Sequence, residues 1–393
     1  MLPLAIYTVN RPQFYGSGIV NPFSKSSKLI GIALIALIHT FAGAQAPPAA
    51  EDEVRLVILG IDAGRTSWRG SEGGGFSAAV KVGSDVYLVD FGRNSMDRYF
   101  QAGLGPPGPQ TMPGGLETLR AAFITHLHGD HVVDFPRLVL FGFPDGAADR
   151  DEPIRIFGPG PRGELPPVSR FLANPSAIVN PLNPTPGTRD MFESIMAAFA
   201  TDLNYGILDS GRRNPVEFLD VRDIRIPPEI GASPTDLAPL MQPFEVYADE
   251  SVSVTAVLVD HAPVFPAFAF RFDTARGSIV FSGDTGPHPN VVTLAQGADL
   301  LVHEVIDGTW ADNLFPEPRS GPDAAAHRHL LESHTDIRVL GDIARRANVG
   351  TLILAHSVPP DLTQEDVDTL VTGFGGDAIL AQPFMEWRLE SRD

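Results

Sequence analysis

Short apolar runs alternate with polar or Pro/Gly-rich stretches along the chain, and the runs fall into two groups. Each run is rich in Val, Ile, Leu, Phe or Ala and is bounded by Gly, Pro or charged residues, which is typical of β-strands. The first group lies before about residue 160 and comprises Val54–Gly60, Ala78–Val82, Val86–Asp90 and Ala121–Thr125. The second lies after about residue 250 and comprises Val252–Val259, Ala267–Phe272, Ser278–Ser282, Leu300–Val302, Leu352–Leu354 and Ala378–Leu380.

Apolar residues recur at helical spacing in segments beside these strands. We predict helices over Val132–Phe143, Met191–Leu203 and Thr335–Ala347. Pro136 falls in the first turn of the first helix, where proline is tolerated. Stretches rich in Pro and Gly predict loops at 101–115, 158–190 and 312–329. Strands in two batches, mixed with helices, predict an α/β fold in which two mixed β-sheets pack together with helices outside, in one domain.

Composition narrows the chemistry. With 393 residues, of which 43% are hydrophobic, the chain is long enough for a large core. It has no cysteine, so disulfides and thiolate metal sites are excluded, and any transition-metal site must use His, Asp or Glu. The formal net charge of -19 argues against nucleic acid as a partner, because such a surface repels polyanions.

The first 44 residues have the order of a secretory signal. Lys25 and Lys28 precede the apolar run Leu29–Ile38, and the small residues Ala42 to Ala44 follow. The alternative is a membrane anchor, but the run is shorter than the roughly 20 residues that a spanning helix needs. We predict a signal peptide region at 1–44, export to the periplasm or beyond, and no stable membrane insertion after cleavage. The remaining 45–393 would form one domain with a Pro-rich insertion at about 158–248.

The most specific motif is His126-Leu-His128-Gly-Asp130-His131. His126 and His128 leave a strand two residues apart, so their side chains can point the same way. Asp130 and His131 follow at the start of the next helix. The first pair would bind one metal ion and the second pair another, although a solvated histidine-rich loop is the alternative.

Four ligands do not complete two zinc sites, because each site needs about four ligands including water. Three later polar residues each follow an apolar strand among small neighbours, namely His261, Asp284 and His356. Each alone is as consistent with an ordinary loop residue. Together they supply the missing ligands.

These residues resemble the metallo-β-lactamase superfamily, whose signature is the His-x-His-x-Asp-His box. The segments Asp260–Phe272 and Phe281–Thr285, the pair His303-Glu304, His334 and Ala355–Ser357 resemble the ribonuclease Z and zinc arylsulfatase branch. The similarity runs from about Val54 to about Pro383. It implies a metallo-β-lactamase-type αββα sandwich.

The resemblance also implies residue roles. One ion would be held by His126, His128 and His261, and the other by Asp130, His131 and His356, with Asp284 bridging the two. The ions would be two Zn²⁺, with Mn²⁺ or Fe as alternatives. Catalytic roles fall to Asp130, which would orient the attacking hydroxide, and to His334, which would protonate the leaving group. His303 and Glu304 would orient ligands, and the alternative is a buried polar pair at a strand end. For His334 the alternative is a helix N-terminal residue.

Two departures from the branch bear on the substrate. Ribonuclease Z carries a basic, glycine-rich arm for tRNA, whereas 158–248 is Pro-rich and has only the isolated pair Arg212-Arg213. The tail after His356 lacks the Ser-x-Arg-Tyr that ribonuclease Z usually shows.

The sequence therefore favours an exported dinuclear zinc hydrolase of small anionic esters, of arylsulfatase or phosphodiesterase type, with nucleic acid an unlikely partner. The alternative is a ribonuclease Z-like tRNA 3′-processing endonuclease. A metal-binding or redox module is a third hypothesis, which the complete ligand set opposes. The oligomeric state is left open, a dimer included.

Overall fold

The computed structural model describes residues 53–64, 68, 70–106 and 115–390. These residues belong to a compact unit, Pro48–Asp393. The predicted signal at 1–44 lies outside the described residues, as does most of the Pro/Gly-rich stretch 101–115. Among the described helices, none has the length and apolar composition needed to cross a membrane.

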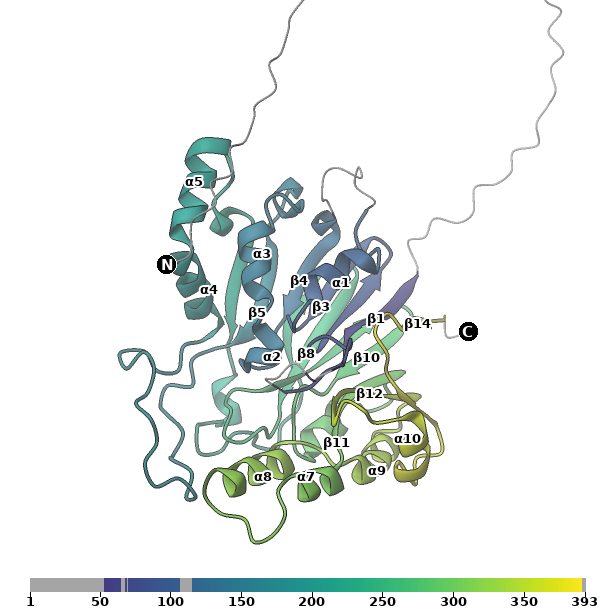
Figure 1. Cartoon of the computed structure of the whole chain (residues 1–393). Coiled ribbons are helices and arrows are strands. Elements are labelled where there is room, and N and C mark those ends of the chain that lie inside the picture. Colours follow the sequence, from purple (N-terminus) through teal and green to yellow (C-terminus); the bar gives the residue numbers. More distant parts are fainter. Residues whose placement is uncertain (1–52, 65–67, 69, 107–114, 391–393) are drawn as a thin grey trace, which may run out of the picture. The chain divides into compact units, whose positions relative to one another are not determined.

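Two seven-stranded mixed sheets form the described part of the chain (Figure 1). The first has the order β14-β1-β2-β3-β4-β5-β6, from β1 (Val54–Gly60), β2 (Ser77–Val82), β3 (Asp85–Val89), β4 (Leu119–Phe123), β5 (Ile154–Pro159), β6 (Leu219–Ile224) and β14 (Glu386–Leu389). The second has the order β13-β12-β11-β10-β9-β8-β7, from β7 (Phe244–Ala248), β8 (Val252–Leu258), β9 (Phe268–Thr274), β10 (Gly277–Phe281), β11 (Leu300–Ile306), β12 (Thr351–Val358) and β13 (Asp377–Leu380). The predicted fold class is confirmed.

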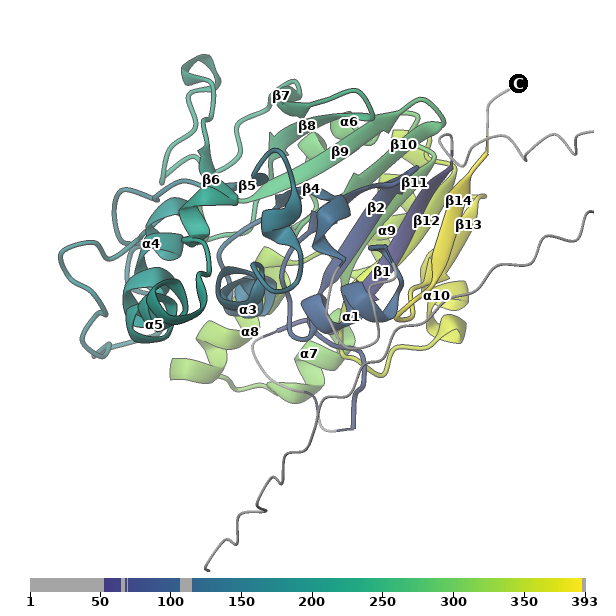
Figure 2. The ribbon, with the colours of Figure 1, turned by 90° about the horizontal axis from the view of Figure 1, so that it is seen from above.

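Helices cover the outer faces of both sheets (Figure 2). On the first sheet lie α1 (Ser95–Gln101), α3 (Phe135–Phe141), α4 (Thr188–Ala198) and α5 (Ala200–Ser210). Beside the second sheet lie α6 (Pro289–Leu294), α9 (Ile337–Ala347) and α10 (Gln364–Leu370). The remaining helices, α2 (Gly129–Val132), α7 (Gly308–Leu314) and α8 (Gly321–Ser333), lie along the edge that carries the candidate site.

The two-residue period of a strand divides the core into layers. Leu56 and Ile58 of β1 point into the main core between the sheets. Val57 and Leu59 point to the opposite face, where they pack in a second cluster with residues of α1 and α3. Both faces of β1 are therefore buried, and this explains why its sequence is a nearly continuous apolar run instead of an alternating one.

Several predicted elements differ from the observed ones. The helix predicted over Val132–Phe143 is broken into α2 and α3, because Pro136 has no N–H to continue the α2 ladder and instead begins a new helix. The helix predicted over Met191–Leu203 is likewise divided at Phe199 into α4 and α5. The loop predicted at 312–329 is wrong for most of its length, since α7 continues to Leu314 and α8 begins at Gly321.

The proposed insertion at about 158–248 contains more regular structure than its Pro content suggests. It holds α4 and α5, and also β6 and β7, which are the edge strands of the two sheets. Neither edge strand was predicted. Only the stretches between these elements lie outside the sandwich, and 160–187 is the longest of them.

Candidate metal centre

The seven predicted metal ligands come together at one edge of the sandwich. His126 and His128 follow β4, and His261 follows β8. Asp284 follows β10, and His356 lies within β12. Each position lies beyond or close to the end of a buried strand, so strands from both sheets place the ligands around one point. Asp130 and His131 are added by the short helix α2.

Four of these side chains form one group. His126, His128, His261 and Asp284 each offer a donor atom, and the four atoms lie within 4.8 Å of one another. His261 Nε2 lies 3.2 Å from His128 Nδ1, and His126 Nε2 lies 3.6 Å from Asp284 Oδ2. Three imidazoles and a carboxylate at this separation are a typical donor set for a transition metal.

A second group adjoins the first. Donor atoms of Asp130, His131 and His356 also lie within 4.8 Å of one another. His131 Nε2 is 3.1 Å from His356 Nε2, and His356 Nε2 is 3.3 Å from Asp130 Oδ2. Asp284 connects the groups, because its Oδ1 lies 3.4 Å from His131 Nε2 while its Oδ2 faces the first group.

Unpartnered buried atoms show that this cluster fits a metal. His126 Nε2, Asp284 Oδ1 and His356 Nδ1 are buried and have no hydrogen-bond partner among the described residues. A buried polar atom without a partner costs free energy, and native structures rarely leave one unexplained. A divalent cation would accept these lone pairs, so the donor set is that of a divalent metal site.

The pKa shifts within the cluster also support a divalent metal site. Burial, reinforced by the neighbouring His131, lowers the pKa of His126 well below its ordinary value. Burial alone would lower the pKa of His131, but the surrounding carboxylates, Asp284 foremost, raise it well above its ordinary value. Burial would raise the pKa of Asp284, but His356 and the other imidazoles hold it well below its usual range. The carboxylates therefore stay ionised, and a metal ion would take the place of imidazole protons.

One buried carboxylate behind the cluster orients two of its histidines. Asp90 Oδ2 lies 2.8 Å from His131 Nδ1 and accepts a hydrogen bond from Thr125 Oγ1 at 2.8 Å. Thr125 Oγ1 in turn lies 3.1 Å from His126 Nδ1. Such partners fix the ring orientation of ligating histidines. Sequence reasoning missed Asp90, although it follows a buried strand in the same way as Asp284.

His334 stands beside the cluster with a buried partner. Its Nδ1 lies 3.1 Å from Glu304 Oε2, and Glu304 Oε1 also accepts a hydrogen bond from Thr335 N. Burial lowers the pKa of His334 to about 4, while burial and then the nearby Asp284 raise the pKa of Glu304 well above its ordinary value. The lowered pKa favours a neutral imidazole, and the raised pKa favours a protonated Glu304 carboxyl. The other predicted orienting residue, His303, bonds the Glu304 carbonyl and reaches no ligand.

A second residue missed by the sequence analysis is His329 on α8. Its ring centroid lies 6.0 Å from that of His128, 5.8 Å from that of His261 and 5.9 Å from that of His334. It lies in the stretch 312–329, which was predicted to be a loop, whereas the structure has α8 there. Of the other unassigned histidines, His288 caps α6 and His327 contacts Asp312, both away from the cluster.

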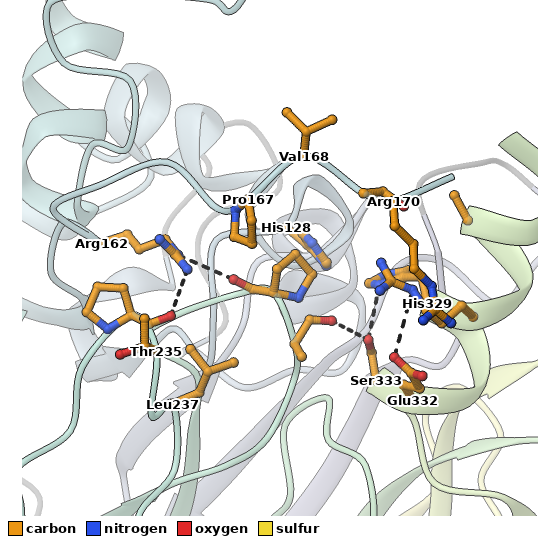
Figure 3. A pocket seen from close by; sticks show the side chains of 16 residues that line it. His128, Arg162, Pro167, Val168, Arg170, Thr235, Leu237, His329, Glu332 and Ser333 are labelled. Atoms are coloured by element: carbon orange, nitrogen blue, oxygen red, sulfur yellow. Dashed lines mark hydrogen bonds and ion pairs between the residues drawn. The ribbon is translucent and has the colours of Figure 1, made fainter. Parts of the chain in front are cut away.

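A cleft of about 820 Å³ opens next to the cluster. His128 and His329 line it, together with Arg162 and Arg170 (Figure 3). Arg328 is a further lining residue. The walls come from the loop 162–170, the neighbourhood of Pro234 and Pro263, and α8. A substrate therefore has a route to the cluster that passes positively charged side chains.

Comparison with known proteins finds relatives of similar sequence. No protein-family model matches it. It is 28% identical over 306 residues to a ribonuclease Z of Mycobacterium marinum, covering 77% of this chain and 88% of that protein. A ribonuclease Z of Mycobacterium bovis is 27% identical over 285 residues, covering 72% and 80%.

Solved structures agree on the fold. The metallo-β-lactamase fold protein YhfI from Bacillus subtilis superposes with a TM-score of 0.51 at 16% identity, covering 86% of this chain and all of that one. The short form of human tRNase Z gives a TM-score of 0.50 at 19% identity, covering 85% and 99%. The chain has the metallo-β-lactamase fold and is similar to ribonuclease Z, as its motifs predicted.

Two expectations from the sequence, on function and on partners, are wrong. The favoured function, an exported hydrolase of small anionic esters, is contradicted by relatives that are named ribonuclease Z. The same relatives contradict the expectation that nucleic acid is an unlikely partner. The net charge of -19 is a sum over the whole chain. It says little about the cleft, where three arginines outnumber the single acidic lining residue, Glu332.

Proposed function

We propose that this chain is a ribonuclease Z-like phosphodiesterase that removes 3′ extensions from tRNA precursors. The observation that carries the proposal is its similarity to ribonuclease Z along 306 residues. The clustered donor atoms described above support it, because hydrolysis of a phosphodiester by this route needs a metal centre.

We further propose that the centre holds two zinc ions, with Mn²⁺ or Fe as alternatives. His126, His128 and His261 would hold one ion, and Asp130, His131 and His356 the other. Asp284 would contact both, since its two oxygens face the two groups. Bound there, the ions would supply a water made nucleophilic near neutral pH and would offset negative charge that develops on the phosphate.

The protein side chains would then position the reactants and deliver a proton. Asp130 Oδ2 accepts a hydrogen bond from Gly64 N at 2.8 Å, which fixes a carboxylate able to orient the attacking water. His334 would donate a proton to the departing ribose oxygen. Because its Nδ1 is engaged by Glu304, the donating atom is Nε2. Glu304 keeps the imidazole oriented and replenishes its proton.

A direct test uses a tRNA precursor with a 3′ trailer and the metal-loaded protein. The expected result is one cut that releases the trailer, together with loss of cleavage on chelation. His128→Ala should lose at least one metal ion and nearly all cleavage. Metal content is measured by elemental analysis of the same samples.

The matched control is His288→Ala, because His288 caps α6 and contacts none of the ligands. It should retain cleavage and metal content. Intact precursor after incubation with metal-loaded protein, with rapid hydrolysis of small aryl sulfates, would refute the proposed function. A protein without bound metal whose activity resists chelators would refute the metal centre.

A further inference from the structure

The cleft beside the metal centre has an unusual concentration of positive charge. Arg162 illustrates how it is built, since its guanidinium donates hydrogen bonds to the carbonyls of Glu164, Pro234 and Pro263 at 2.7, 3.0 and 3.4 Å. These acceptors are uncharged. Arg162 therefore ties the surrounding loops together and keeps its charge uncompensated at the wall of the cleft.

Two further arginines of the cleft contact the same aromatic ring. Arg170 stands 4.9 Å from the centre of the Phe171 ring, and Arg328 of α8 stands 5.7 Å from it. Arg170 makes no ion pair with any described carboxylate. Arg328 has only Glu332, with Nε 3.8 Å from Oε2, and that Nε is buried without a hydrogen-bond partner among the described residues. Two guanidinium groups that share a ring and a cleft repel each other, and an anion bound between them would offset this repulsion.

The pair is adjacent to the reaction centre. Arg328 is the chain neighbour of His329, whose ring lies 6.0 Å from that of the proposed ligand His128, and all three line the same cleft. Figure 3 shows Arg170 and His329 on the same side of the cleft. An anion held by Arg170 and Arg328 would thus lie next to, but outside, the metal centre.

We propose that Arg170 and Arg328 bind a backbone phosphate of the RNA strand adjacent to the phosphate that is cut. A small ester carries only the phosphate that reacts, so a second anion site beside the centre is useful only to a substrate with several phosphates. Guanidinium groups suit this role because they bind phosphate through two parallel hydrogen bonds. The inference rests on the proposed function and adds to it the residues that distinguish a polynucleotide from a small ester.

Binding is tested separately from cleavage. The probe is an RNA oligonucleotide with bridging methylenephosphonate linkages, which cannot be hydrolysed, bound to the metal-loaded protein and followed by fluorescence anisotropy. Arg170→Gln and Arg328→Gln should each weaken binding about 3- to 10-fold. The double variant should also lower the slope of log affinity against log salt, by about 0.7 for each lost phosphate contact on a single strand.

Selectivity supplies the second readout. For the double variant, the ratio of kcat/KM for tRNA precursor to that for a small activated phosphodiester should fall at least tenfold. Arg388→Gln is the control, because that arginine lies on β14, is 68% exposed and pairs with Glu53. Its binding, salt slope and selectivity should match those of the native protein.

The outcomes separate the two proposals. Unchanged RNA affinity and salt slope in the double variant would overturn the role of the arginines, whether or not the native protein cuts tRNA. If the native protein binds the probe through these arginines but leaves tRNA precursor intact, the proposed function fails and the phosphate site stands. Equal losses in the Arg388→Gln control would show a general effect of charge and would overturn the site.

Discussion

Asp90 supports the metal centre without offering it a ligand. It is fully buried, and its carboxylate contacts both His131 and Thr125, the second of which reaches His126. Its backbone φ of 58° is unusual for a residue other than glycine. From this position the carboxylate orients His131 directly and His126 through Thr125, so it acts on histidines of both metal groups.

Asp90→Asn should weaken metal binding about 10- to 100-fold, the usual cost of losing an outer partner of a ligating histidine. The measurement is competition for zinc against a chromogenic chelator. Asp220→Asn is the control, since Asp220 pairs with Arg222 on β6, away from the centre. Equal zinc affinity in native and Asp90→Asn proteins would show that the carboxylate serves only the fold.

If His334 and Glu304 deliver a proton to the leaving group, the effect of replacing them should depend on that leaving group. His334→Ala should lower turnover by ~10²–10⁴-fold on substrates with poor leaving groups and much less on activated aryl esters, which need no proton. Glu304→Gln should give a smaller loss with the same dependence, because it removes the exchangeable carboxyl proton but keeps an acceptor for Thr335 N. A uniform loss on all substrates, or loss of metal, would make the role structural.

At the scale of single residues, the sequence predicted those site residues that lie in one short motif or directly follow an apolar strand. The box from His126 to His131 is contiguous, and His261, Asp284 and His356 each follow an apolar run. Asp90 gave the same signal but was counted as the last residue of its strand. His329 gave no signal, since its approach to the centre depends on where α8 packs.

At the level of elements, proline and glycine caused most of the errors. Gly321 and Pro322 suggested a loop, but they begin α8, where proline is favoured in the first turn. The edge strands β6 and β7 were missed because they lie between Pro-rich stretches and are only partly buried. Central strands such as β1 and β11 were found because burial on both faces makes their sequences continuously apolar.

Packing of α9 can be tested through a pair of helical glycines. A Cβ at Gly341 would lie 2.0 Å from the Thr372 carbonyl oxygen, so Gly341→Ala should cost about 1–3 kcal/mol through overpacking. That cost exceeds the ~1 kcal/mol gained in helix propensity. At Gly206 in α5 a Cβ would meet mainly the mobile end of Arg212, so Gly206→Ala should be neutral or stabilising.

Midpoints of urea unfolding compare the two variants with the native protein. Gly341→Ala should unfold at lower urea concentration, and Gly206→Ala at the same or a higher concentration. A Gly341→Ala protein as stable as the native one would mean that α9 moves away from residue 372 at little cost.

For the whole molecule, export stays a prediction. The order of charged, apolar and small residues from Lys25 to Ala44 predicts a mature protein that begins near Gln45 and lies outside the cytoplasm. Amino-terminal sequencing after cell fractionation measures both. Soluble cytoplasmic protein that retains residues before Gln45 would refute export, and it would place the chain where tRNA precursors are made.

The convergence of ligands from both sheets has a consequence for unfolding. His126 and His128 follow a strand of the first sheet, whereas His261, Asp284 and His356 follow or belong to strands of the second. A metal bound between them would act as a crosslink across the sandwich, which unfolding must break. Ligand linkage puts the gain at about 4 kcal/mol when free metal exceeds its Kd a thousandfold. Zinc should therefore raise the melting temperature in calorimetry and chelation should lower it, and a melting temperature indifferent to zinc would mean that the sheets hold together without the ion.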